Sequence, residues 1–256
     1  MMNTRLVNTP PALTFRWLGM NGTEVTVPDE TDAHVIDLSR GERRTVRLPD
    51  AGADTTVRVR LAEGACLNLV QIRPEGSENT SVLTVEADCE KDAQFHWYRV
   101  VTGGKTYDAC TVRLSGDGAC FTADVAYRLA GDDVYDAAVT ALHSGRKTES
   151  TIFASGVLSG RANKLFRGTI DLRKGAKGAV GNETEDVLLL SDDVQNGSLP
   201  VILCSEEDVE GNHGASIGQP DEELLYYLQT RGIGREEALA MLAQAKIDAV
   251  LRKIPD

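Results

Sequence analysis

The sequence is poor in several features that common protein classes require. Only four of its 256 residues are histidine, five are cysteine, and aromatic residues make up 5%. The N-terminal residues lack the apolar core of about 7–15 residues that a signal peptide carries. No stretch approaches the ~20 apolar residues of a membrane-spanning helix. We therefore expect a cytoplasmic protein with no membrane partner.

Cations are also scarce. Lys and Arg number 27 against 39 Asp and Glu, which gives a formal net charge of −12. A nucleic-acid-binding surface needs clustered cations that displace phosphate counterions, and anionic lipid attracts basic segments. The composition therefore argues against a nucleic-acid partner and against docking on a membrane surface.

The five cysteines form no CxxC pair and no zinc-type spacing. An odd number of cysteines in a chain without a secretory signal favours free thiols in a reducing compartment. We expect most of the thiols before Cys204 to be small, buried hydrophobic groups.

Motifs of common enzymes are absent as well. The sequence contains no GxxxxGK[ST], GxSxG or HExxH, and no GxGxxG that opens a helix. Two carboxylate pairs, Glu149 with Asp171 and Asp192 with Asp193, would be the candidates if the chain cleaved a polysaccharide. Charged residues on exposed turns are far commoner than catalytic pairs, so these pairs carry little weight.

Residues 22–180 consist almost entirely of short strand patterns. In one of them Val57, Val59 and Leu61 alternate with polar residues, which is the period of two that a strand with one buried face shows. No stretch of ten residues in this region keeps a helical period, so we predict an all-β region. The predicted strands are TEVTVP (23–28), RTVRLP (44–49), TTVRVRL (55–61), CLNLVQI (66–72), SVLTVEA (81–87), QFHWYRVV (94–101), ACTVRL (109–114) and CFTADVAYRL (120–129).

The turns between these strands resemble one another. A small or charged pair followed by alanine recurs in EGAC, KDAQ, DGAC and KGAK, with central alanines at Ala65, Ala93, Ala119 and Ala176. Their separations are 28, 26 and 57 residues, and the last is close to twice the earlier steps. A repeat of this length predicts a solenoid in which each rung buries its face against the next. A β-sandwich, which also has short and regularly spaced strands, is the alternative.

The last part of the chain changes to a helical pattern. A first helix is predicted from the acidic residues Glu222 and Glu223, which suit a helix N-terminus, to Gly232, which suits a helix stop. A second helix opens at Arg235 after the connection RGIG. Its predicted apolar face consists of Ala238, Leu242, Ala245 and Ala249. The chain divides into a β core with an N-terminal segment at 1–218 and a helical subdomain at 219–256.

One histidine stands apart in EGNHGASIG (210–218), where Gly211 and Gly214 flank His213. Cys204 lies nine residues upstream, and a thiolate beside an imidazole would suit a soft metal or an iron–sulfur unit. Two ligands make an incomplete site, and the same residues could form a simple turn between a strand and the helices. Spacing alone favours the turn.

Four segments carry a resemblance to a known family. FRGTIDL (166–172), VLLLSDD (187–193), EDVEGNHGASIG (207–218) and ELLYYLQTRGI (223–233) occur in this order. They resemble the C-terminal core of the SufB/SufD family of iron–sulfur cluster assembly proteins. TPPALTFRWLGMNG (9–22) also resembles the N-terminal region of SufD-type members. The chain is thus identified as a SufD-like member, shorter than the usual ones.

This resemblance implies an all-β solenoid, a right-handed β-helix, with a small C-terminal α-helical subdomain. It implies a scaffold rather than a catalyst, which pairs through its β-helix as a homodimer or with a SufB-like partner. The helices would dock a SufC-type ABC ATPase. Iron or an iron–sulfur cluster would be held transiently at the subunit interface and not tightly by this chain alone.

The resemblance also implies roles for particular residues. His213 matches a histidine at the scaffold interface where iron or a nascent cluster binds, and Cys204 is a second candidate ligand or a packing residue. Gly211 replaces a family cysteine, and the cluster cysteine of SufB types has no counterpart in 191–200. Two alternatives remain, a β-solenoid polysaccharide lyase or hydrolase and a purely structural partner of the ATPase. The expected ATPase-binding residues are Tyr226, Tyr227, Arg231, Gly232 and Ile233.

Overall fold

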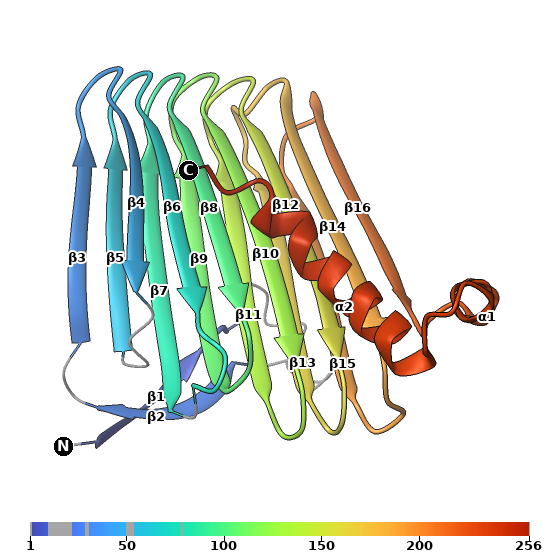
Figure 1. The fold of residues 1–256 in the computed structure, drawn as a ribbon. Helices are drawn as coiled ribbons and strands as arrows, with labels where there is room; N and C mark the ends of the chain where they lie inside the picture. The colour runs from blue at the N-terminus through green and yellow to red at the C-terminus, as the bar shows by residue number, and fades with distance from the viewer. Residues whose placement is uncertain (1, 10–21, 29–30, 50–53, 78, 256) are drawn as a thin grey trace.

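Two parallel sheets of seven strands each form the body of the protein. The computed structural model describes residues 2–9, 22–28, 31–49, 54–77 and 79–255, so most of the N-terminal motif at 9–22 lies outside the described residues (Figure 1). One sheet, here called the odd sheet, contains β3 (Thr31–Leu38), β5 (Asp54–Leu61), β7 (Thr80–Cys89), β9 (Lys105–Leu114), β11 (Val134–His143), β13 (Asn163–Leu172) and β15 (Gln195–Cys204). The even sheet contains β4 (Arg43–Pro49), β6 (Cys66–Arg73), β8 (Gln94–Val101), β10 (Cys120–Leu129), β12 (Glu149–Leu158), β14 (Ala179–Leu189) and β16 (Val209–Gly218).

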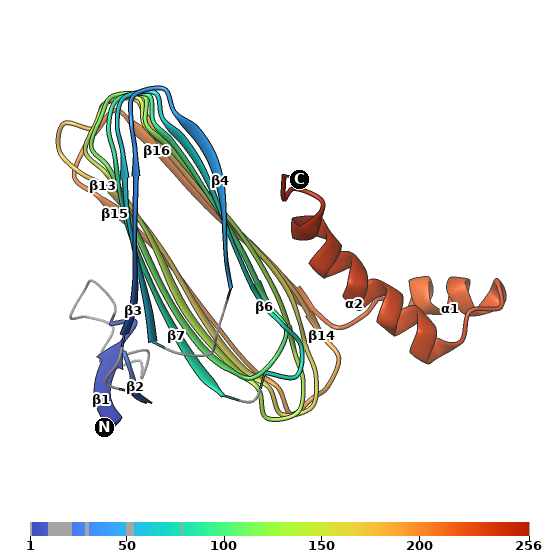
Figure 2. The ribbon, with the colours of Figure 1, turned by 60° about the vertical axis from the view of Figure 1, so that its left-hand side comes forward.

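The chain alternates between the two sheets and winds as a solenoid. Each rung is one odd strand, a tight turn and one even strand, and each strand pairs in parallel with its equivalent in the next rung. Figure 2 shows the two sheets facing each other with the rungs stacked behind one another. A sandwich of the immunoglobulin type would have antiparallel sheets. The structure therefore confirms the predicted solenoid, and each of the eight predicted strand segments lies within a strand.

The turn alanines stack as predicted over the first rungs, and then the stack departs from the prediction. Ala119 O accepts a hydrogen bond from Glu149 N–H, and Thr148 O accepts one from Val180 N–H, at 3.0 and 2.9 Å. Thr148 therefore follows Ala119 in the stack, and the next position belongs to Ala179 rather than to Ala176. The prediction of Ala176 was wrong because the turn at 173–178 is longer than the turns before it. The confirmed members are Ala65, Ala93 and Ala119, all fully buried.

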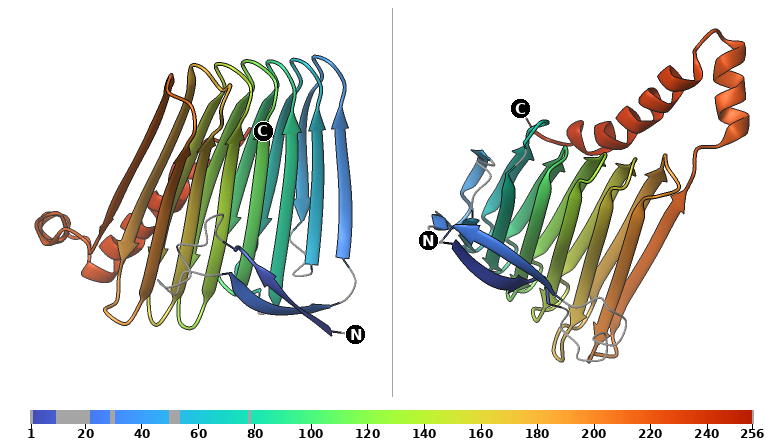
Figure 3. Two further views of the ribbon diagram at one scale, coloured as in Figure 1. Left: turned by 180° about the vertical axis from the view of Figure 1, so that it is seen from behind. Right: turned by 90° about the horizontal axis from the view of Figure 1, so that it is seen from below.

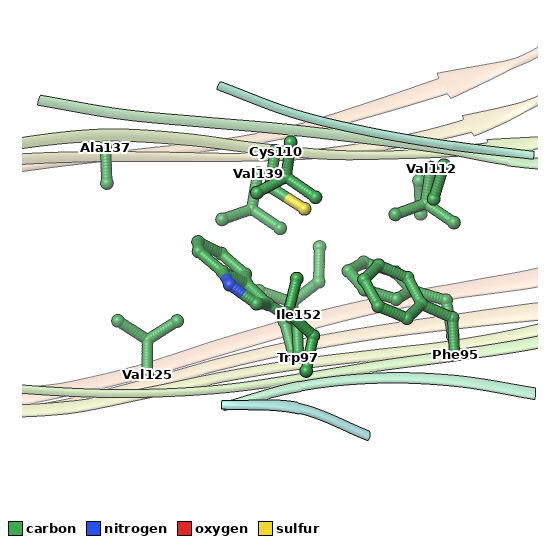
Figure 4. Packing of buried hydrophobic residues seen from close by; sticks show 14 of the residues in the cluster. Phe95, Trp97, Cys110, Val112, Val125, Ala137, Val139 and Ile152 are labelled. Carbon is green, nitrogen blue, oxygen red and sulfur yellow. The ribbon is translucent and has the colours of Figure 1, made fainter. Parts of the chain in front are cut away.

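The core lies between the sheets and is filled by the inward-facing row of every strand. Figure 4 shows Phe95 and Trp97 of the even sheet reaching toward Cys110 and Val112 of the odd sheet. Two of the free cysteines lie in this core, since Cys89 and Cys110 are fully buried. Desolvation raises the pKa of the Cys89 thiol to about 12, so this cysteine acts as a small hydrophobic side chain.

A hairpin covers part of the outer face of the odd sheet. β1 (Met2–Val7) and β2 (Thr23–Pro28) pair in antiparallel fashion and cross this sheet (Figure 3). Val25 and Val27 of the hairpin pack with Val82 of β7. The hairpin thus buries an outward-facing apolar row that would otherwise meet solvent.

The long helix α2 (Arg235–Leu251) covers the outer face of the even sheet (Figures 1 and 3). Its buried residues Ala243, Ile247 and Val250 pack on the sheet, whereas Ala245 and Ala249 of the predicted face are exposed. The predicted face was confirmed at Ala238, which is buried, and at Leu242, which is partly buried against the core, and it was wrong at Ala245 and Ala249. The larger Ile and Val side chains take the buried positions there because they remove more apolar surface from water than alanine methyl groups do. Neither this helix nor α1 (Glu222–Thr230) is long and apolar enough to cross a membrane.

Two ion pairs, one from α2 and one from the residues just after it, fasten the end of the chain to the sheet. Lys246 Nζ lies 2.5 Å from Asp186 Oδ2 of β14, and Lys253 Nζ lies 2.5 Å from Asp124 Oδ1 of β10. The Asp124 side chain is almost fully buried and also accepts from His96 Nε2 at 2.8 Å. These two donors lower the pKa of the Asp124 carboxyl, although its burial opposes them.

A buried histidine ends β11 in the inward-facing row. The ring nitrogens of His143 lie 2.8 Å from Thr148 Oγ1 and 2.8 Å from Ser150 Oγ. The neighbouring rungs have Leu114 and Leu172 at this position. Burial lowers the pKa of His143 from 6.5 to about 4, so the ring is neutral and each nitrogen is satisfied by a hydroxyl group.

We predict that His143 makes stability depend on pH. Below pH 6.5 the unfolded chain takes up a proton on this ring, whereas the folded ring stays neutral down to about pH 4. The free energy of unfolding should therefore fall by on the order of 3 kcal/mol as the pH drops through this window. Urea unfolding across pH 4 to 7 should show a flatter profile for His143→Leu than for the wild type. Equal profiles for the two proteins would contradict the prediction.

Candidate functional site

The last rung of the solenoid, here called the terminal rung, has an open edge. It consists of β15, the turn at 205–208 and β16, which pair only with β13 and β14 in the part of the chain that the structure describes. Every residue of β16 from Glu210 to Gly218 is exposed. Strand edges of this kind present unpaired N–H and C=O groups to any chain that can add a strand.

His213 lies in the middle of β16, so the interpretation of EGNHGASIG as a turn was wrong. Its Cα partner in β14 is Glu183, a buried residue of the inward-facing row. Paired residues on parallel strands point to the same side of a sheet, so His213 belongs to the inward row of the open end. Gly211, two residues earlier in this row, leaves space for Ile202 of the opposite sheet, because a Cβ at Gly211 would lie 3.1 Å from Ile202 Cγ2.

Cys204 occupies a different part of the terminal rung. It ends β15 in the odd sheet, it is exposed, and its Sγ donates to Glu206 O at 3.1 Å. Within the described residues, no three or more His, Cys, Asp and Glu side chains gather in a way that could hold a metal ion. The structure thus brings His213 together with Glu183 rather than with Cys204.

A charged cluster fills the interior just below the terminal rung. Lys164 Nζ contacts a carboxylate oxygen of Glu185 and lies 3.1 Å from Ser198 Oγ, and its side chain is fully buried. Tyr127 OH donates to Glu185 Oε1 at 3.0 Å, and Ser198 Oγ donates to Glu185 Oε2. Burial lowers the pKa of Lys164 and raises that of Tyr127 well above its ordinary value. Glu185 is therefore a buried carboxylate whose charge is balanced and hydrogen-bonded.

Glu183 is the second buried carboxyl group at this end. Burial, together with the charge of Glu185, raises the pKa of Glu183 to about 7, although Lys164 opposes the shift. Its Oε2 has no hydrogen-bond partner among the described residues. The carboxyl group lies against Gly168 of the opposite sheet, where a Cβ would lie 2.1 Å from Glu183 Oε1.

Sequence reasoning missed Lys164, Glu183 and Glu185. The available signal was the spacing of Glu183 and Glu185 two residues apart in a strand, which puts both on one face. Their inward direction follows only from the register with the neighbouring strands.

The helical subdomain has the predicted start and stop. Asp221 caps α1, because its Oδ1 accepts from Glu223 N–H at 2.9 Å. At the other end Gly232 adopts a φ of 87°, and Ile233 N–H donates to Leu228 O at 3.2 Å. This is a Schellman motif, in which glycine adopts the left-handed conformation at low cost. Gly232 therefore sets the direction in which the chain leaves α1.

The first helix is held away from the solenoid and exposes an aromatic surface. Figure 3 shows α1 beyond the end of the sheets, following β16 along the chain and leading into α2. Tyr226 is 70% exposed and Tyr227 is 52% exposed. The Arg231 guanidinium lies 5.3 Å from the centre of the Tyr227 ring. The structure thus gathers the predicted ATPase-binding residues at one end of the molecule, separate from His213 on β16.

The carboxylate pairs considered for polysaccharide cleavage do not form a site. Glu149 and Asp171 lie next to the inward residues Ser150 and Leu172, on the outer faces of opposite sheets, so their side chains point apart. Asp171 also pairs with Arg173 at 2.9 Å. Asp192 and Asp193 lie in the turn after β14. Asp192 accepts a hydrogen bond from Gln219, which lies between β16 and α1.

We predict that Lys164→Met destabilises the fold strongly. The substitution leaves Glu185 buried without a cation, which typically costs about 3–5 kcal/mol of unfolding free energy. Urea unfolding at pH 7 should show the loss, and Lys164→Met combined with Glu185→Leu should recover most of it. The matched control is Arg161→Met, which breaks an exposed ion pair with Asp132 and should cost less than about 1 kcal/mol. Equal losses for the two single variants would contradict this prediction.

Comparison with known proteins points to one family. The family described as SUF system FeS cluster assembly, SufBD core domain, matches residues 20–246. SufD of Bacillus subtilis is 29% identical over 166 residues, which cover 64% of this chain and 38% of that protein. SufB of the same organism is 25% identical over 238 residues, which cover 91% of this chain and 50% of that protein.

A chloroplast relative extends the range of organisms. The SufBD family protein ABCI8 of Arabidopsis thaliana is 30% identical over 168 residues, which cover 64% of this chain and 30% of that protein. The chain spans half or less of the length of these three relatives. Since the family match takes in both the solenoid and most of the helical subdomain, the chain belongs to the SufBD family of the SUF iron–sulfur cluster assembly system.

Proposed function

We propose that this chain is a SufD-like, non-catalytic scaffold subunit of a SUF-type iron–sulfur cluster assembly complex. The observation that carries the proposal is the position of His213 in the inward row of an open terminal rung. Relatives named as iron–sulfur cluster assembly proteins SufD and SufB support the biochemical setting. The chain contributes surfaces and ligands, and the ATP-driven work belongs to a partner.

The terminal rung is the proposed pairing surface. Strands β15 and β16 each leave one edge open in the described structure, and β16 is exposed along its length. A second solenoid end can continue both sheets by backbone hydrogen bonds, which also removes an edge that invites unwanted association. The partner is a second copy of the chain or a SufB-like subunit.

The pairing surface is also the proposed place where iron or a nascent cluster is held as cargo. His213 supplies an imidazole nitrogen, a ligand that suits iron. This chain has no complete ligand set among its described residues, so the remaining ligands come from the partner. Cys204 stays a weaker candidate, because it lies at the turn end of the opposite sheet and its thiol donates to Glu206 O.

The exposed end of the helical subdomain is the proposed docking site for a SufC-type ABC ATPase. Tyr226 and Tyr227 present large amphipathic rings, and Arg231 extends the same surface. Tyr and Arg are the residues that most often dominate binding energy at protein interfaces. Gly232 and Ile233 form the stop of α1 and fix the direction of this surface.

Two other functions have less support. A polysaccharide lyase or hydrolase needs converging acidic residues, and the candidate carboxylates point apart or lie in a turn. A purely structural partner of the ATPase would keep the helical surface but would give His213 no role. Metal loading of the assembled complex separates this second function from the proposed one.

We expect the full chain to co-purify with a SufC-type ATPase. Tyr227→Ala and Arg231→Ala should each weaken the complex by a factor of about 30, since a central interface residue contributes about 2 kcal/mol or more. Binding can be measured by titration calorimetry with the purified ATPase, and thermal unfolding should show that the variants fold.

The matched control is Val35→Ala, which removes an exposed apolar side chain at the opposite end of the solenoid. It should bind the ATPase as the wild type does. The docking proposal fails if the wild type does not associate, or if both helix variants bind as tightly as the control.

A further inference from the structure

Glu183 lies where a second ligand beside His213 would be needed. It occupies the inward row of β14, and its Cα partner in the terminal rung is His213. Neighbouring strands of a sheet lie about 4.8 Å apart, and paired side chains point to the same side. A carboxylate oxygen and an imidazole nitrogen from these two positions can therefore approach one small ligand at the open end.

The Glu183 carboxyl group fits into the interior because the position across from it is a glycine. Across the interior stands Gly168, and any side chain there would collide with Glu183 Oε1. On the terminal rung Gly211 precedes His213 in the same inward row and adds no side chain. The carboxyl group therefore occupies the space that Gly168 leaves, in the interior one rung below His213.

The two buried glutamates differ in how they are satisfied. Glu185 accepts from Tyr127 and Ser198 and pairs with Lys164. Glu183 is 5% exposed, yet its Oε2 has no hydrogen-bond partner among the described residues. Burying a carboxyl oxygen without a partner is costly. An unsatisfied oxygen of this kind is expected where an occupant completes the site.

We propose that Glu183 is a protein ligand of the cargo metal, and that Glu183 and His213 form a two-ligand half-site for ferrous iron at the open end of the solenoid. The inference rests on the proposed role of His213 and names the residue that acts with it. A carboxylate oxygen and an imidazole nitrogen are the ligand types of non-haem ferrous sites. Two ligands from one chain leave the other coordination positions to sulfide and to the partner chain.

The proposed half-site does not require Cys204 in the first binding step. Its thiol ends β15 at the turn and donates to Glu206 O, whereas Glu183 stands directly beside His213 in the same sheet. Ferrous iron can therefore enter on oxygen and nitrogen ligands before any thiolate is involved.

The test is metal binding to the purified full-length chain, assembled with its partner where one co-purifies. Ferrous iron under anaerobic conditions and Co²⁺ alone serve as probes, with calorimetry for affinity and the visible absorption bands of Co²⁺ for the ligand set. Glu183→Gln and His213→Ala should each weaken binding at least tenfold, because even loss of an outer-shell partner costs about 10–100-fold in metal affinity. Glu210→Gln, on the exposed neighbouring position of β16, should bind as the wild type does.

The outcomes separate this inference from the proposed function. If Glu183→Gln binds like the wild type and His213→Ala does not, Glu183 is structural and the inference is overturned, while the role of His213 stands. If both variants bind like the wild type, the metal role of His213 fails as well. Should Glu183→Gln not fold, Glu183→Asp withdraws the carboxylate by one methylene and keeps its charge. A weakened affinity and shifted Co²⁺ bands then support the inference, and unchanged values overturn it.

Discussion

The in-register stacking of parallel rungs is the constraint on which the rest of this structure depends. Each inward side chain lies about 4.8 Å from its equivalent in the next rung, so a row of like residues forms a continuous core. Every substitution in a row is felt by two neighbouring rungs. A charge can enter such a row only if an adjacent position neutralises it, as Lys164 does for Glu185 and Arg99 does for Asp108 across 2.7 Å. The same rule makes the open end exceptional, because a row there has a neighbour on one side only.

The sequence was sufficient to predict the strands and helices, but it was less sufficient to predict the register in which they pack. Alternation such as Val57, Val59 and Leu61 predicts a strand because the period of two is a local property. The helix signals at Glu222, Glu223 and Gly232 are local as well, and both ends of α1 were confirmed. The stack position of Ala179 could not be predicted, because it depends on the length of a turn that no local rule fixes. Likewise the sheet, and not the helix, decides which face of α2 is buried.

The residues of the candidate site also differ in whether the sequence alone could predict them. His213 was found through a resemblance carried by its flanking motifs, whereas its own spacing favoured a turn. Glu183 lies thirty residues upstream and becomes its neighbour only through the pairing of β14 with β16. Lys164 reads as an ordinary exposed lysine beside a strand, and only the register shows it buried in the interior. Contacts between rungs depend on the tertiary structure, so the local sequence around a charged residue does not reveal them.

The way α2 is fastened has a mechanical consequence. The helix crosses the even sheet obliquely, and ion pairs tie it to β10 and β14 while its apolar face packs over β8, β10 and β12. Any tilt of the helix would slide these rungs past one another and strain the whole hydrogen-bond ladder between them. A load on α2 is therefore shared among the several rungs that the helix contacts.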